Sequence, residues 1–119
     1  MFEISKKFEF AAAHHLPKLP KTHKCHRPHG HNYQVIVTLR FNKLDQRGFV
    51  IDYGEMKPIK DWIDENLDHR DLNDMLSNPT AEVLAEFLFG IFEKLVPFLY
   101  SVCVKETENT TATYWRSVE

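Results

Sequence analysis

Histidine is concentrated in one short part of this 119-residue chain. Six of its seven histidines fall between positions 14 and 31, and the seventh is His69. Neutral imidazole nitrogens are favoured ligands of Zn²⁺, which binds them at roughly 2.0–2.1 Å. His29 and His31 are two residues apart, so both side chains project from the same face of an extended backbone. This pair needs one more histidine to form a three-nitrogen metal site.

His14 is the third candidate ligand. Apolar residues alternate from Phe8 to Ala12, and His14 continues that row. His29 and His31 extend the apolar row of a second expected strand backwards, so an antiparallel pairing of the two strands sets all three histidines together. Three protein ligands leave a fourth position for water or substrate, as in catalytic zinc sites. The other histidines of this segment continue no apolar row, and we do not expect them to bind the ion: His15, His23 and His26.

Cys25 is open to two interpretations. Its neighbours Lys24, His26 and Arg27 make an electropositive setting, which favours the thiolate and suits a base or nucleophile. Alternatively, Cys25 lies four residues before His29 and is a fourth ligand of a structural site with one cysteine and three histidines.

Two other places in the chain carry candidate acid–base groups. Asp68 and His69 are adjacent, and a carboxylate can orient an imidazole for proton transfer, although an ordinary pair at a helix end is the alternative. Glu106 falls on the apolar face of an expected strand, where an unpaired carboxylate is costly. We therefore expect a cationic side chain, or a ligand with two N–H donors, to satisfy Glu106.

The surrounding pattern predicts an α+β fold in the order ββααββ, with a four-stranded antiparallel sheet and two helices on one face. We expect strands over residues 2–13, 30–42, 99–106 and 112–118. The first helix is expected to open at a capping box of Asp52 and Glu55, and the second near Thr80. Residues 15–28 show no periodicity, and a loop of that length is more often functional than accidental.

Composition and charge limit the classes of function. The chain is 43% hydrophobic and 27% charged with a formal charge of −2, so it has no electrostatic footprint for nucleic acid. It contains no apolar stretch of membrane-spanning length. Two cysteines, Cys25 and Cys103, are too few for a secreted disulfide framework. We expect one domain over residues 1–119, in the cytoplasm, with neither a nucleic acid nor a membrane as partner.

Together, these motifs resemble the 6-pyruvoyl-tetrahydropterin synthase family, and specifically its bacterial branch, the 6-carboxytetrahydropterin synthases of queuosine and 7-deazapurine biosynthesis. The resemblance runs through FEFAAAHHLP, HKCHRPHGHNYQV, GFVIDYGEMK, LDHRDLN, NPTAEVLAEF and VKETENTTATY. It implies the tunnelling fold, in which the sheets of several subunits join into a barrel. It also implies a homo-oligomer, usually a hexamer, with active sites at subunit interfaces.

The resemblance further implies roles for individual residues. One zinc ion per subunit is implied at His14, His29 and His31. Cys25 matches the cysteine that accepts a proton, and Asp68 with His69 matches an acid–base pair. Glu106 matches the glutamate that binds the pterin, and Thr80 and Glu82 fall in a segment that lines the pterin pocket in the family.

The implied substrate is 7,8-dihydroneopterin triphosphate. In the carboxy branch, triphosphate is lost and the side chain is cut, which releases acetaldehyde and leaves 6-carboxytetrahydropterin. The spacing between His14 and Cys25 resembles that of bacterial members and favours this product. The alternatives are a 6-pyruvoyl-tetrahydropterin synthase, which leaves the side chain uncut, a dihydroneopterin-triphosphate aldolase-like relative, and a non-catalytic structural zinc module.

Overall fold

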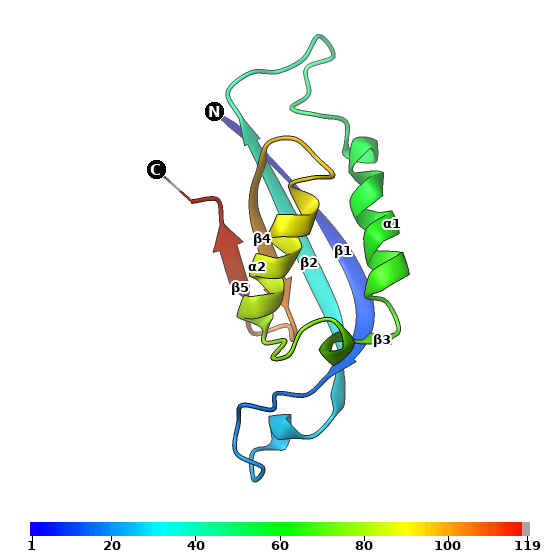
Figure 1. Ribbon diagram of the computed structural model, residues 1–119. Helices are drawn as coiled ribbons and strands as arrows, with labels where there is room; N and C mark the ends of the chain where they lie inside the picture. The colour runs from blue at the N-terminus through cyan, green and yellow to red at the C-terminus, as the bar shows by residue number, and fades with distance from the viewer. Residues whose placement is uncertain (118–119) are drawn as a thin grey trace.

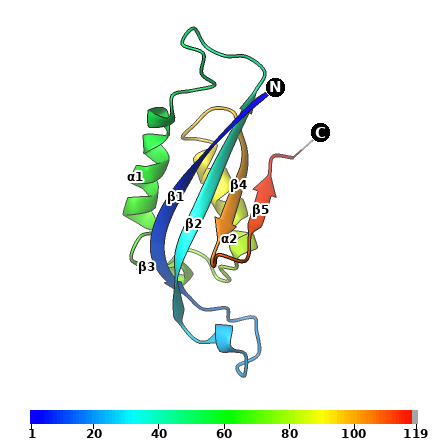
Figure 2. The same cartoon turned by 180° about the vertical axis from the view of Figure 1, so that it is seen from behind.

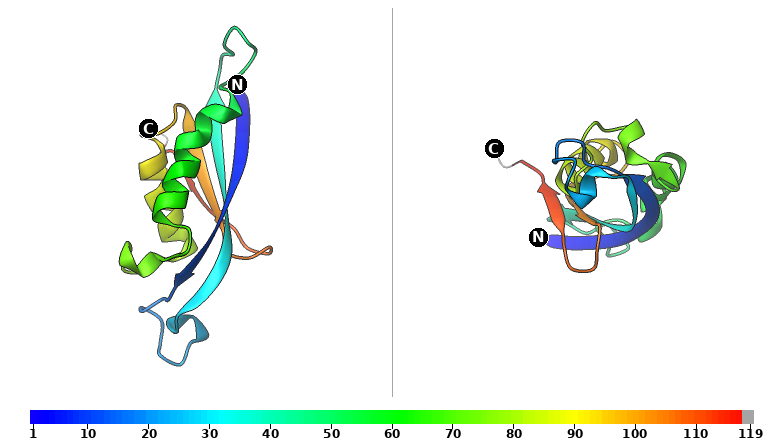
Figure 3. Two further views of the ribbon diagram at one scale, coloured as in Figure 1. Left: turned by 90° about the vertical axis from the view of Figure 1, so that its right-hand side faces the viewer. Right: turned by 90° about the horizontal axis from the view of Figure 1, so that it is seen from below.

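The computed structural model describes residues 1–117, which form a five-stranded sheet with two helices on one face (Figures 1 and 3). The strands are β1 (Phe2–His14), β2 (His29–Phe41), β3 (Arg70–Asp71), β4 (Leu99–Lys105) and β5 (Ala112–Trp115). The helices are α1 (Lys57–Asn66) and α2 (Ala81–Phe92). Short 3₁₀ turns lie between β1 and β2 (Lys24–His26), directly before α1 (Tyr53–Met56) and between β3 and α2 (Leu72–Asp74). No helix within these residues is both long and apolar enough to cross a membrane.

The strand order is β3-β1-β2-β4-β5, and every neighbouring pair is antiparallel except β1 with β3. The expected α+β class and both expected hairpins are confirmed. The expectation of four antiparallel strands is wrong in one respect, because β3 pairs in parallel with Ala12 and Ala13. A strand of two residues shows no periodicity, so sequence patterning could not reveal it. The predicted end of the last strand, residue 118, lies outside the described residues.

The core lies between the helices and the sheet face that they cover. β1 and β2 pair from Phe2 opposite Phe41 to His14 opposite His29, so alternate residues of both strands point toward the helices. Burying each large apolar side chain there contributes roughly 1.5–3 kcal/mol. The buried side chains include Phe8, Phe10, Val35, Val37, Leu39, Ile59, Ile63, Leu84 and Leu88. Figure 2 shows the opposite face of the sheet, which carries no helix.

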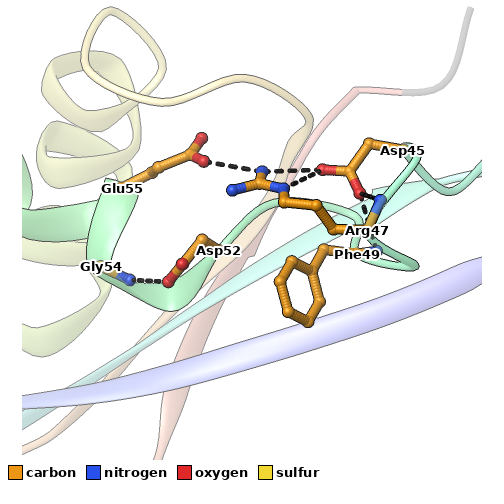
Figure 4. Close-up of polar contacts among 6 residues, drawn as sticks. All are labelled: Asp45, Arg47, Phe49, Asp52, Gly54 and Glu55. Atoms are coloured by element: carbon orange, nitrogen blue, oxygen red, sulfur yellow. Dashed lines mark hydrogen bonds and ion pairs between the residues drawn. The ribbon is translucent and has the colours of Figure 1, made fainter.

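The start of α1 corrects the predicted capping box. The Asp52 carboxylate accepts a hydrogen bond from the Gly54 N–H at 2.8 Å and caps the short 3₁₀ turn, so α1 begins only at Lys57 (Figure 4). Glu55 does not reach back to Asp52. It accepts instead from the Arg47 guanidinium at 3.0 Å.

Arg47 also donates to the Asp45 carboxylate at 2.8 Å, so its guanidinium joins the turn after β2 to the start of the helical segment (Figure 4). The second helix begins where the sequence predicts. The Thr80 hydroxyl accepts a hydrogen bond from the Val83 N–H at 3.1 Å, which is an ordinary N-cap, and α2 starts at the next residue.

Candidate metal centre

The end of β1 and the start of β2 bring three histidines together. His14 lies directly opposite His29 in the strand register, and His31 follows two residues later on the same face. One nitrogen of each ring lies within 4.8 Å of the other two. His14 is only 1% exposed, whereas His29 and His31 are half-buried. The rings therefore converge as the strand pairing predicts, at the edge of the core.

Two backbone carbonyls set the tautomers of His14 and His29. The Nδ1–H of His14 donates to the Pro79 carbonyl, and that of His29 donates to the Arg27 carbonyl, each at 2.8 Å. A neutral imidazole with its hydrogen on Nδ1 carries a lone pair on Nε2. The two Nε2 atoms are 3.0 Å apart, so two lone pairs face each other. Nitrogens bound to one tetrahedral zinc ion lie about 3.3 Å apart, and a cation between these rings fits that spacing.

The third ring offers its own free nitrogen. His31 Nε2 is buried and has no hydrogen-bond partner, and the nearest carboxylate oxygen, Glu106 Oε2, is 3.6 Å away. Burial lowers the pKa of His31, and the neighbouring His14 and His29 lower it further, although Glu106 opposes them. His31 is therefore neutral at pH 7, which is the state that binds a metal ion.

Tyr33 supports the centre from the core side. Its hydroxyl lies 3.2 Å from His14 Nδ1, and burial, with the nearby negative charge of Glu106, raises the pKa of that hydroxyl. Tyr33 therefore stays protonated and adds no charge. The period-two pattern of β2 predicts only that Tyr33 is buried. The Pro79 and Arg27 carbonyls have no sequence signal, because every residue carries such a group.

Within the part of the chain that the structure describes, the sulfur of Cys25 is not among the candidate metal ligands that lie close together. It lies half-buried in the 3₁₀ turn of the long loop, where its N–H donates to His23 Nδ1 at 3.0 Å and its carbonyl accepts from the Leu16 N–H at 2.8 Å. This arrangement does not support the structural site in which Cys25 is the fourth ligand.

Asp68 and His69 form a pair fixed to β1. His69 Nδ1 lies 3.0 Å from Asp68 Oδ2, and Asp68 Oδ1 accepts a hydrogen bond from the Ala11 N–H at 2.9 Å. The Ala11 N–H and the His69 ring lower the pKa of Asp68, so the carboxyl is ionised at neutral pH. His69 has a left-handed backbone, with φ of 59°, and its side chain is 82% exposed. Such strain persists where the surrounding structure imposes it, and it is frequent at functional sites.

Two open pockets meet at His31. One, of about 540 Å³, is lined by His31 and His69 among others, and the second, of about 380 Å³, is lined by His31 and Glu106 among others. His69 and Glu106 thus line two pockets that share His31. The other sequence-predicted site residues line neither pocket. They are His14 and His29 of the metal centre, Asp68, Cys25, Thr80, whose hydroxyl is engaged as a helix cap, and Glu82, which is exposed on α2.

The chain is similar in sequence to known proteins over nearly its whole length. The profile of the 6-pyruvoyl tetrahydropterin synthase family matches residues 3–117. A 6-carboxy-5,6,7,8-tetrahydropterin synthase of Synechocystis is 38% identical over 97% of this chain and 94% of its own length. The human 6-pyruvoyl tetrahydrobiopterin synthase is 30% identical over 94% of this chain and 90% of its own length.

The fold agrees equally well. The structure of a Caenorhabditis elegans 6-pyruvoyl tetrahydropterin synthase superimposes with a TM-score of 0.86 and 28% identity, covering 98% of this chain and 96% of that one. This likeness confirms the expected tunnelling fold, although the sheet of one chain is open and not a closed barrel. By sequence and by fold, the chain belongs to the 6-pyruvoyl tetrahydropterin synthase family.

Proposed function

We propose that this protein is a zinc-dependent 6-carboxy-5,6,7,8-tetrahydropterin synthase of queuosine and 7-deazapurine biosynthesis. It acts as a lyase: it converts 7,8-dihydroneopterin triphosphate and one water into 6-carboxytetrahydropterin, acetaldehyde and triphosphate. The Synechocystis relative carries the name of this activity at 38% identity. We further propose that the whole chain is one catalytic domain and works in the cytoplasm.

The observation that carries this proposal is the set of lone pairs at the end of β1 and the start of β2. His14, His29 and His31 each bring one ring nitrogen to within 4.8 Å of the other two. Nitrogen ligands without a carboxylate favour Zn²⁺ over Mg²⁺ or Ca²⁺. When bound, zinc supplies Lewis-acid polarisation of the side-chain oxygens of the pterin.

Proton transfer is assigned to the other groups. The Cys25 thiolate takes a proton from the substrate side chain, and His69, supported by the ionised Asp68, returns one at another carbon. His69 and His31 line one pocket, but Cys25 lines neither of the two pockets that meet at His31. A homo-oligomer, with the hexamer favoured, brings Cys25 of one subunit to the pocket of another.

Glu106 is assigned to the pterin ring. Its half-buried carboxylate forms no ion pair with a lysine or arginine within the described residues, and its Oε2 lies 3.6 Å from Nε2 of the neutral His31. A carboxylate in this setting fits two parallel N–H donors, which the guanidine-like edge of a pterin provides. Thr80 and Glu82 are assigned to the wall of the same binding site by the family motif alone.

A second activity, 6-pyruvoyl-tetrahydropterin synthesis, is favoured by the human and Caenorhabditis elegans relatives. It eliminates triphosphate without cutting the side chain and consumes no water. Incubation of the zinc-loaded protein with 7,8-dihydroneopterin triphosphate, followed by mass analysis, separates the two. We expect acetaldehyde in equal amount with 6-carboxytetrahydropterin, and an intact pyruvoyl side chain without acetaldehyde would overturn the carboxy assignment.

A further inference from the structure

The connector, residues 68–79 between α1 and α2, runs beside the last residues of β1. Its first two residues bond to the backbone of Ala11: the Asp68 carboxylate accepts from the N–H, and the His69 N–H donates to the carbonyl. β3 then pairs with the next two residues of β1. The connector is thus attached to the strand end that leads to His14.

Asn73 continues this attachment past the end of the strand. Its side-chain Oδ1 accepts from the His15 N–H at 2.8 Å, and its Nδ2 donates to the His15 carbonyl at 3.0 Å. One side chain therefore makes the two bonds that a paired strand makes with a neighbouring residue. Asn73 is itself fixed, because its own N–H donates to the Asp71 carboxylate at 2.9 Å.

We propose that Asn73 is a positioning residue of the metal centre, an inference that rests on the proposed metal site. His15 follows His14 directly, so a clamp on both backbone groups of His15 fixes the direction of the His14 side chain. The same connector holds His14 at a second point, through the Pro79 carbonyl on Nδ1. The ring is thereby fixed at its backbone and at the nitrogen that faces away from the ion.

The position of the clamp explains why an amide is needed. β1 ends at His14, and the unpatterned loop begins at the next residue, so without Asn73 the His14 backbone is held from one side only. Only asparagine or glutamine offers an acceptor and a donor side by side, and the shorter side chain fits the observed distances. Mutation of a group that supports a metal ligand typically lowers metal affinity by about 10–100-fold.

The test uses Asn73→Ala, Asn73→Asp and a matched control, Asn66→Ala. Asn73→Asp keeps the size of the side chain, and thus the fold, but it loses the donor to the His15 carbonyl. Asn66 is a half-buried asparagine whose side chain donates to the Trp62 carbonyl within α1. Zinc affinity is measured by competition with a chromophoric chelator. The visible spectrum of the Co²⁺-loaded protein reports ligand geometry independently of catalysis.

We expect both Asn73 variants to keep the wild-type far-UV circular dichroism, to bind zinc about tenfold more weakly and to show an altered Co²⁺ spectrum, with Asn66→Ala unchanged. Folded Asn73 variants with wild-type affinity and spectrum would overturn the inference, as would an equal loss in Asn66→Ala. A wild-type chain that binds neither metal would instead overturn the metal centre itself.

Discussion

At the scale of single residues, the metal centre depends on which nitrogen of each ring is already in use. The Pro79 and Arg27 carbonyls occupy Nδ1 of His14 and His29, so only Nε2 remains on either ring. His31 contributes a buried nitrogen with no other partner. Metal binding therefore requires no rearrangement of hydrogen bonds at these rings, which favours a preorganised site.

Cys25 separates an enzyme from a structural zinc module. Because its sulfur is not part of the converging group, we expect Cys25→Ala to keep one zinc per chain and the wild-type melting temperature. Turnover of 7,8-dihydroneopterin triphosphate should fall to background, since the proposed proton acceptor is gone. Metal content by atomic emission, with a thermal melt, checks this. A variant that loses its zinc and melts earlier would identify Cys25 as a ligand.

Asp68 gives a prediction for the pH dependence of stability. Its pKa is lowered in the folded state, first by the Ala11 N–H, so the ionised carboxyl stabilises the fold above its usual pKa of 3.8, and the contribution is lost as the pH falls through the folded pKa. We expect Asp68→Asn to be less stable than wild type at pH 7, with the difference shrinking below pH 3.8.

Urea unfolding at several pH values measures this difference. Asp74→Asn, which changes an exposed carboxyl of the same connector, is the control and should track the wild type more closely. A difference between Asp68→Asn and wild type that stays constant from pH 7 to the acid limit would contradict the ionised role of Asp68.

At the scale of elements, the connector between the helices contains one residue with a strained backbone, His69. His69 adopts φ of 59° so that its N–H reaches the Ala11 carbonyl while its imidazole projects into solvent beside Asp68. A left-handed conformation costs a residue with a Cβ roughly 1–2 kcal/mol. The strain is the consequence of holding an exposed imidazole next to a fixed carboxylate.

His69→Gly and His69→Ala separate this strain from the chemistry of the ring. Both lack the imidazole, so both should lose turnover equally. Glycine alone adopts this backbone without cost, so we expect His69→Gly to exceed His69→Ala in free energy of unfolding by about 1 kcal/mol. Chemical denaturation measures the difference. Equal stability of the two variants would mean that the strain is relieved elsewhere.

Much of this arrangement could be predicted from residue patterns. The period-two rows of β1 and β2 place His14, His29 and His31 on one face, and hairpin pairing then brings them together. β3 could not be predicted, because two residues show no period. The capping box failed because Glu55 is engaged by Arg47, eight residues earlier, and a local motif carries no information about such a competitor. The Asn73 clamp joins residues 58 positions apart and has no local signature.

At the scale of the whole molecule, the sheet of one chain is open. Its edges are β5 on one side and, on the other, the part of β1 that β3 leaves unpaired. The unpaired N–H and C=O groups of such edges readily form hydrogen bonds with a strand of another chain. We expect an oligomer whose mass by light scattering is six times 14.0 kDa. A monomer that turns over substrate at the full rate would contradict an interface site.

Mixing two inactive variants tests whether subunits share the active site. Cys25→Ala and His69→Ala are each expected to be inactive. If Cys25 and His69 of one site come from different subunits, refolding the two variants together should restore part of the wild-type rate. The same two variants assayed separately are the controls. A mixture that remains inactive, although mass spectrometry shows mixed oligomers, would assign both groups to one chain.

Removal and return of the metal tests most sharply whether turnover depends on an ion held by His14, His29 and His31. The protein is stripped with a chelator, shown to remain folded, and assayed with 7,8-dihydroneopterin triphosphate while Zn²⁺ is titrated back. We expect no turnover without metal and full recovery at one zinc per chain, with no recovery in a stripped His31→Ala variant. Undiminished turnover by the metal-free protein would contradict a catalytic role for the ion.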